Sequence, residues 1–431
     1  MRKKTAIWLC WLCWSGLQGQ ILQGQSLQVS SPDQTLCFKL SICETPGTQG
    51  VPVYSLTWKN QPVILDSRLG IVTAEKPAWT SGFTLVSHRT RTIDERWKPV
   101  YGEKSRVRNH CTECVADLMQ NQDESRKMQL IIRVYNSGAA FSYFFPENLA
   151  TSIITIQDEI SEFAFPDGTL AWTTPFAQER YQLRPLRDWS VEQSLPLSRW
   201  SPRTDEYECE RPLTLQLTNG IYAALGEARL FDYSRMKFVL SADKKNTVVS
   251  RLFGSVTESS PVQTPWRVIM VADKPGDLLQ YNDLFLNLNP PCAIADTRWI
   301  KPGKVMREIT LSTSGARALI DFCSRHRIEY IEFDAGWYGT GLVPSRTVFE
   351  GDWGIMAGDW RPNPNWHNGT LKPVSDAAHA AGMQFLVWVE PCRAVQGRPI
   401  TLAHPEYFLT GNPDGKIRDG HVAPLAAGPL L

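Results

Sequence analysis

The sequence has no excess of charge of either sign and no apolar run of membrane-spanning length. Lys plus Arg number 45 and Asp plus Glu number 44, which leaves a formal net charge of +1. This balance gives no indication of a nucleic-acid or membrane-surface partner. The longest apolar run, residues 6–17, is shorter than the roughly 20 residues that a helix needs to cross a bilayer. We therefore expect no membrane span.

The first residues instead match a secretory signal. A basic start at residues 2–4 precedes the apolar run, and small and polar residues follow it. This order of segments predicts a signal peptide over residues 1–25 that is removed on export. We therefore expect a periplasmic or secreted protein, in a compartment where disulfides can form.

The sequence also lacks the paired cysteine motifs of a zinc site. Residues 26–431 contain eight cysteines, and a single CxxC, formed by Cys111 and Cys114 beside His110. A zinc site of this type requires a second ligand pair, and none is present in residues 26–431. Inert thiols or an ordinary disulfide are therefore favoured over a metal or redox role for Cys111 and Cys114.

Helical periodicity is scarce between residues 26 and 290. Short β-type runs separated by Asn, Asp, Gly, Pro and Ser clusters fill this region, and examples are QSLQVSS, QTLCFKLSI, MQLIIRVY, AAFSYFF, YAALGEARL and TPWRVIMVA. So many strands over this length predict a large β-sandwich at residues 26–290. Consecutive prolines and then a Pro-Gly follow, and they predict a linker at residues 291–304.

Residues 305–431 show a different pattern. Helical spacing at residues 315–326 precedes an apolar strand at 328–333, and a second helix at 373–381 precedes a strand at 384–389. A further strand is expected near residues 304–309. Asp334 and Glu390 follow two of these strands directly. Alternating helices and strands predict a parallel α/β barrel, in which both acids face the same mouth at the carboxyl ends of the strands.

Several long stretches are similar to one family of enzymes. They are ERWKPVYGEKSRVRNH (95–110), RVYNSGAAFSYFFPE (133–147), TPWRVIMVADKPGDLL (264–279), NLNPPCAIADTRWIKPGK (287–304) and EFDAGWYG (332–339). The chain thereby resembles glycoside hydrolase family 97, secreted bacterial α-glucosidases and α-galactosidases. The resemblance implies a multidomain β plus α/β protein, with an N-terminal β-super-sandwich and then a (β/α)8 TIM barrel. It also implies hydrolysis of terminal α-linked galactose or glucose residues of oligosaccharides.

The resemblance assigns site residues as well. Glu390 corresponds to a strand-end carboxylate at the catalytic centre, and Asp334 to a contact with a substrate hydroxyl. Arg393 is either a sugar contact or the charge partner of Glu390. The resemblance also implies that six residues line the sugar pocket: Trp337, Tyr338, Asp352, Trp353, Asp359 and Trp360. Packing within a loop explains each of the aromatic side chains equally well. The family binds calcium, for which Glu179 is the candidate ligand here; the alternative is a solvated acid beside Arg180.

The barrel portion contains fewer strands than a closed barrel needs. The sequence provides three strands and the beginning of a fourth unit, whereas a closed barrel of this type has eight. The tail KIRDGHVAPLAAGPLL resembles the short run of residues that a frameshift or a misplaced stop produces; the alternative is an ordinary loop end. We therefore expect a partial, C-terminally truncated barrel over residues 305–431. The glycosidase activity is accordingly expected of the full-length form, of which this chain is an incomplete fragment that is inactive alone. The alternative functions are a non-catalytic carbohydrate-binding module and an interaction module of a polysaccharide-utilisation system.

Overall fold

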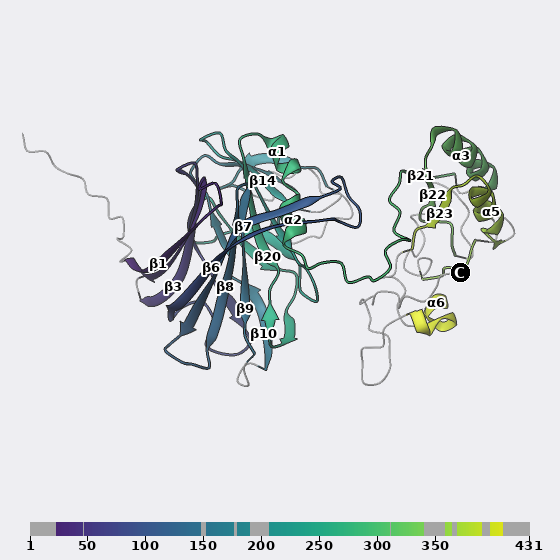
Figure 1. Cartoon of the computed structure of the whole chain (residues 1–431). Coiled ribbons are helices and arrows are strands. Elements are labelled where there is room, and N and C mark those ends of the chain that lie inside the picture. The colour runs from purple at the N-terminus through teal and green to yellow at the C-terminus, as the bar shows by residue number, and fades with distance from the viewer. Residues whose placement is uncertain are drawn as a thin grey trace, which may run out of the picture. The chain divides into compact units, whose positions relative to one another are not determined.

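A computed structural model describes the chain at residues 23–45, 47–147, 152–175, 179–189, 207–310, 312–339, 358–363, 369–389 and 397–407. The expected signal peptide at residues 1–25 therefore lies almost entirely outside the described residues. Two compact units make up the chain, and they divide between Ala295 and Asp296. Figure 1 labels strands and helices of both units.

One layer of the N-terminal unit is a seven-stranded sheet. Its strands, in spatial order, are β1 (Gln23–Ser30), β2 (Leu36–Thr45), β3 (Thr48–Trp58), β4 (Gln61–Arg68), β11 (Glu162–Ala164), β17 (Thr247–Leu252) and β16 (Met236–Leu240). All of these neighbours pair antiparallel. In β2, every second residue from Leu36 to Ile42 is buried. This period of two is the pattern of a strand with one face on a core.

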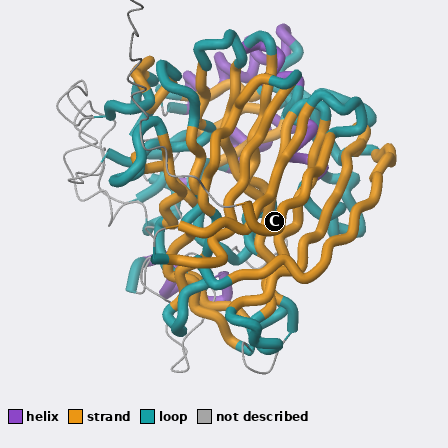
Figure 2. The backbone as a smooth tube through the Cα atoms, turned by 90° about the vertical axis from the view of Figure 1, so that its left-hand side faces the viewer, coloured by secondary structure: helices purple, strands orange, loops and turns teal. Residues whose placement is uncertain are grey.

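The second layer is a ten-stranded antiparallel sheet. Its spatial order is β13 (Gln182–Pro185), β12 (Leu170–Thr173), β14 (Leu213–Gln216), β15 (Tyr222–Ala228), β20 (Trp266–Ala272), β9 (Gly138–Phe145), β8 (Lys127–Tyr135), β7 (Val107–Gln120) and β6 (Phe83–Trp97), with β19 (Val262–Gln263) paired to β9. A smaller sheet contains β18 (Val256–Ser259), β10 (Ile153–Glu159) and β5 (Ile71–Thr73). Figure 2 shows how strands dominate this unit.

The inner faces of the two large sheets enclose the main core. Phe38 and Tyr54 of the first sheet stack with ring centroids 5.1 Å apart, and Tyr54 also lies 5.1 Å from Phe141 of the second sheet. Interdigitated aromatic rings of this kind hold two sheets face to face. The expected β-sandwich is confirmed, and each of the six β runs quoted above overlaps a strand: β1, β2, β8, β9, β15 and β20.

Two short helices cover the outer face of the ten-stranded sheet. They are α1 (Pro275–Gln280) and α2 (Asp283–Asn287), and Leu278, Leu284 and Leu288 pack on Val268 and Met270 of β20. Strand β20 is consequently buried on both faces. Residues 289–304 after α2 contain no helix or strand.

The C-terminal unit contains a parallel three-stranded sheet in the order β21 (Val305–Glu308), β22 (Tyr330–Phe333), β23 (Gln384–Val387). Its helices are α3 (Thr313–His326), α5 (Lys372–Ala380), α6 (Pro399–Ala403) and the 3₁₀ helix η5 (Pro405–Tyr407). Helix α3 precedes β22 and α5 precedes β23, as the sequence pattern predicts. Since three parallel strands are described, closure into a barrel stays a prediction.

Helix α3 illustrates how the local sequence sets this unit. The hydroxyl of Ser312 accepts a hydrogen bond from the Gly315 amide at 3.1 Å and caps the helix N-terminus. Arg327 ends the helix with a left-handed backbone, φ 54°. Ile320 and Cys323 of α3 and Val374 and Ala378 of α5 form one core cluster with the strands. No helix in the described part of the chain is long and apolar enough to cross a membrane.

Candidate functional site

The candidate site lies at the carboxyl ends of the three parallel strands. Ile331 and Phe333 of β22 are buried in the cluster that includes α3 and α5. Side chains alternate between the two faces of a strand, so Glu332 and Asp334 lie on the face opposite the helices. In the register of the sheet, Arg307 of β21 is paired with Glu332. One face therefore presents a cation and two carboxylates near the strand ends.

Asp334 makes an ion pair on this face. Its Oδ2 atom contacts an Nη2 atom of Arg307, whose side chain is 60% exposed while that of Asp334 is 18% exposed. Sequence reasoning missed Arg307. The alternation in the strand expected at 304–309 was available as a signal, but pairing with Asp334 depends on the register between β21 and β22.

The neighbouring acid Glu308 has a structural role. It ends β21 with 3% exposure, and its Oε1 atom accepts hydrogen bonds from the amide of Thr310 at 2.9 Å and the hydroxyl of Thr310 at 2.5 Å. A Cβ atom on Gly315 would lie 1.9 Å from that hydroxyl. Glu308 thus stabilises the turn into α3, and it lies on the helix side of the sheet with Phe333.

The aromatic residues after β22 are packed inside the unit. Trp337 is 5% exposed and Tyr338 is fully buried. The indole nitrogen of Trp337 donates to the carbonyl of Trp388 at 2.7 Å, and Tyr338 stacks on the Trp388 ring at 6.3 Å. This burial agrees with the packing alternative for these aromatics, and a sugar contact stays a prediction.

A second loop segment pairs with this one. The amide of Gly339 donates to the carbonyl of Arg361 at 2.9 Å, and Tyr338 forms an isolated β-bridge with Pro362. Asp359 is 4% exposed and accepts two hydrogen bonds from the Arg361 guanidinium, each 2.7 Å long. These hydrogen bonds raise the pKa of Arg361 above its ordinary value. Trp360 is half-buried against the core of this unit.

The remaining site predictions fall in two groups. Asp352, Trp353, Glu390 and Arg393 lie outside the described residues. Glu179 lies in the N-terminal unit, where its Oε1 atom accepts a hydrogen bond from the amide of Arg180 at 3.2 Å. Within the described ranges, no group of three or more His, Cys, Asp or Glu side chains could hold a metal ion. A calcium ion takes six to eight oxygen ligands, so these ranges alone do not form the expected calcium site.

The CxxC motif lies in the middle of strand β7. Cys111 belongs to the outer cluster with Trp266, whereas Cys114 belongs to the core between the sheets. Residues three apart in a strand point to opposite faces, which prevents a disulfide or a shared metal. Both thiols are free and buried, and burial raises the pKa of Cys111 to about 11. The inert-thiol alternative therefore explains this pair.

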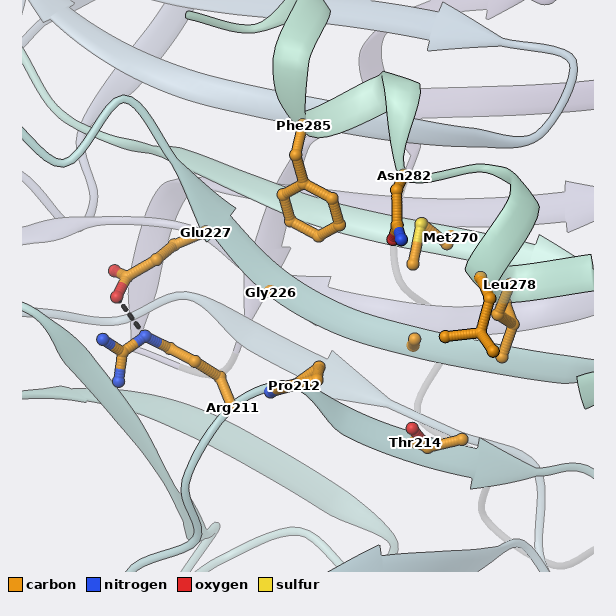
Figure 3. A pocket seen from close by; sticks show the side chains of 11 residues that line it. Arg211, Pro212, Thr214, Gly226, Glu227, Met270, Leu278, Asn282 and Phe285 are labelled. Atoms are coloured by element: carbon orange, nitrogen blue, oxygen red, sulfur yellow. Dashed lines mark ion pairs between the residues drawn. The ribbon is translucent and has the colours of Figure 1, made fainter. Parts of the chain in front are cut away.

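The N-terminal unit contains a cavity of about 290 Å³ on the outer side of its ten-stranded sheet. Figure 3 shows Arg211 and Glu227 meeting at one end, and Met270 and Leu278 at the other. Glu227 also accepts a hydrogen bond of 2.9 Å from Arg267, which is fully buried and pairs with Glu159. The charged groups of the cavity thus neutralise one another, and none of the predicted site residues lines it.

The comparisons decide the family. The model of the N-terminal domain of glycosyl-hydrolase 97 matches residues 29–291, which is more than half of the chain. The chain belongs to glycoside hydrolase family 97. The family resemblance inferred from the sequence is therefore confirmed.

Individual relatives agree with this assignment. A probable retaining alpha-galactosidase of Streptomyces bingchenggensis is 24% identical over 353 residues, covering 79% of this chain and 49% of the relative. A retaining alpha-galactosidase of Bacteroides thetaiotaomicron is 23% identical over 376 residues, covering 78% and 53%. The chain thus spans about half the length of the curated relatives it matches.

A solved structure shows the same fold. It is a glycoside hydrolase family 97 enzyme from Pseudoalteromonas sp. in complex with acarbose, with a TM-score of 0.69 and 22% sequence identity. The match covers 83% of this chain and 53% of that structure's chain.

Proposed function

We propose that this protein is an α-glycosidase that releases terminal α-linked galactose or glucose from oligosaccharides. The observation that carries the proposal is the position of Asp334 in this chain, at the carboxyl end of the central parallel strand and in an ion pair with Arg307. The carboxyl ends of parallel strands are where barrel enzymes place their chemistry. The names of the relatives support the substrate class.

Cleavage of a glycosidic bond needs two carboxyl groups across that bond. We assign one of them to Glu390, which lies three residues beyond the end of β23 at Val387, whereas Asp334 directly follows β22. Asp334 is assigned to a sugar hydroxyl, since a carboxylate accepts hydrogen bonds from hydroxyl groups. We further propose retention of configuration, as in the names of the two relatives.

Aryl α-galactoside and aryl α-glucoside assays of the protein, in the form that its gene encodes, test this proposal. We expect turnover of at least one substrate, loss of that turnover in Glu390→Gln, and initial release of the α-anomer in proton NMR spectra. Binding of galactose or glucose without turnover of either substrate would favour the non-catalytic carbohydrate-binding module. If neither turnover nor binding is detected, the glycosidase and the carbohydrate-binding functions are both contradicted, and the interaction module is left.

We also propose that Glu179 supplies one carboxylate of a calcium ion. Family membership supports this assignment, and the hard carboxylate oxygen suits calcium. The described residues do not supply the other ligands, so no catalytic step is assigned to the ion.

Export is a further part of the proposal. The basic start and the apolar run at residues 6–17 support a signal peptide and a periplasmic or secreted location. N-terminal sequencing of the protein from periplasmic and culture fractions tests it. We expect a mature chain that begins after residue 19, and an intact Met1 would contradict export by this signal.

A further inference from the structure

The ion pair between Arg307 and Asp334 leaves hydrogen-bonding capacity unused. A guanidinium group has five N–H donors and no acceptor, whereas a carboxylate accepts only. The Arg307 side chain is 60% exposed, and Asp334 is its one charged contact recorded in the described ranges. Most of the Arg307 side chain is therefore exposed, on the face of the sheet that lies away from α3 and α5.

The position of the ion pair favours a role in sugar binding over a role in stabilising the fold. Glu332 is paired in register with Arg307, so the cation has a carboxylate neighbour on the same face and another at the strand end. An ion pair with one largely exposed partner contributes little to stability. A donor and an acceptor side by side are the complement of two adjacent hydroxyl groups, because one hydroxyl accepts from the cation and the other donates to the acid.

We propose that Arg307 is a substrate-binding residue, and that Arg307 and Asp334 together bind two neighbouring hydroxyl groups of the terminal sugar. This inference rests on the proposed glycosidase function and extends it. It names the recognised feature of the substrate as a free vicinal diol on the sugar that is released. Arg307 donates to the oxygen of one hydroxyl, and Asp334 accepts from the other hydroxyl.

Monodeoxy substrates test the contact directly. The protein, in the form that its gene encodes, is assayed with whichever aryl α-glycoside it hydrolyses and with the analogues that lack the hydroxyl at C2, C3, C4 or C6. Wild type is compared with Arg307→Gln, Arg307→Lys and the control Arg325→Gln. Arg325 lies in the last turn of α3, in an exposed ion pair with Asp321. That turn leads into the amino end of β22, so the loss of Arg325 removes a similar charge at the edge of the sheet opposite the carboxyl ends of the strands.

The expected result is that Arg307→Gln loses substrate affinity, and that this loss depends on one hydroxyl of the sugar. With the parent glycoside, Arg307→Gln raises KM about 10- to 100-fold, the effect of losing a charge-assisted hydrogen bond. With the deoxy substrate that lacks the hydroxyl bound by Arg307, wild type shows a similarly raised KM. Arg307→Gln raises KM on that substrate by less than about a further twofold, since the hydroxyl that Arg307 binds is already absent. Arg307→Lys retains part of the affinity, and Arg325→Gln matches wild type throughout.

Two other outcomes separate this inference from the proposed function. If Arg307→Gln raises KM equally on every substrate, or leaves KM unchanged on the parent glycoside, the proposed role of Arg307 is overturned. The glycosidase function is unaffected by either result. The lysine variant covers the case in which the glutamine variant fails to fold, because it keeps the charge. Failure of wild type to hydrolyse either parent glycoside would overturn the proposed function and this inference with it.

Discussion

At the residue scale, the proposed function depends on the carboxylate of Asp334. Replacement by Asn keeps the size of the side chain but removes the negative charge that pairs with Arg307 and that strengthens the proposed hydrogen bond from a sugar hydroxyl. We expect Asp334→Asn to lower kcat/KM about 10- to 100-fold, because a hydrogen bond to a charged group contributes about 1.5–3 kcal/mol. Steady-state kinetics with the aryl glycoside measure this effect. An unchanged kcat/KM would remove Asp334 from the site.

The calcium proposal is also tested at a single residue. Calcium that binds the folded state raises the melting temperature by mass action. We expect added calcium to raise the melting temperature of wild type by several degrees above the value in EDTA, and to raise that of Glu179→Gln less. Glu103→Gln is the matched control, since Glu103 is an exposed acid of the β6–β7 connection. Equal shifts in wild type and Glu179→Gln would exclude Glu179 as a ligand.

At the scale of elements, a row of charges links three strands of the ten-stranded sheet. Glu113 of β7 is the register partner of Arg91 on β6 and of Arg133 on β8. Its carboxylate accepts hydrogen bonds from Arg91 at 2.7 Å and from Arg133 at 2.9 Å. Burial acts to raise the pKa of Glu113, but the hydrogen bonds and the positive charges of Arg91 and Arg133 together outweigh burial and lower the pKa from its ordinary 4.5. The ionised form is therefore favoured in the folded state.

This pKa shift predicts how stability depends on pH. A depressed carboxylate pKa contributes stability above the ordinary value of 4.5, and the contribution is lost as the pH falls through the lower, folded-state pKa. We expect Glu113→Gln to cost about 1–3 kcal/mol at pH 7, because it leaves Arg133 without its charge partner.

Urea unfolding at a series of pH values measures this difference, which should shrink as the pH falls below 4.5. Asp94→Asn is the control on the same strands, since the pair between Asp94 and Arg108 is half exposed on both sides, and such exposed pairs contribute little to stability. A difference between wild type and Glu113→Gln that stays constant with pH would contradict the expected role of Glu113.

At the scale of the whole molecule, the connection between the two compact units is accessible. Residues 289–304 contain no helix or strand, and Trp299 is 70% exposed. Exposed segments without backbone pairing are the preferred sites of proteolysis. We expect limited trypsin digestion to cut after Arg298 and to release a stable N-terminal fragment. Mass spectrometry identifies the fragment, and Arg298→Gln should delay its release. First cuts inside strands of the sandwich would contradict this expectation.

Predictions from the sequence succeeded where the determining interactions are local. Alternating burial in β2 and the helical spacing of α3 depend on residues a few positions apart, so strand and helix positions followed from pattern. The change from β runs to helix and strand pairs likewise separated the two kinds of architecture. Family membership was accessible for a related reason, because long ordered stretches preserve the family pattern along the chain.

The sequence by itself therefore determined the β-sandwich, the parallel strand and helix units, and the placement of Asp334 at a strand end. The tertiary structure alone decided which side chains meet. The register between β21 and β22 brings Arg307 to Asp334, packing buries Trp337 and Tyr338, and the alternation of β7 separates Cys111 from Cys114. The physical reason is that backbone pattern is set by neighbours along the chain, whereas contacts between strands depend on pairing and core packing between distant segments.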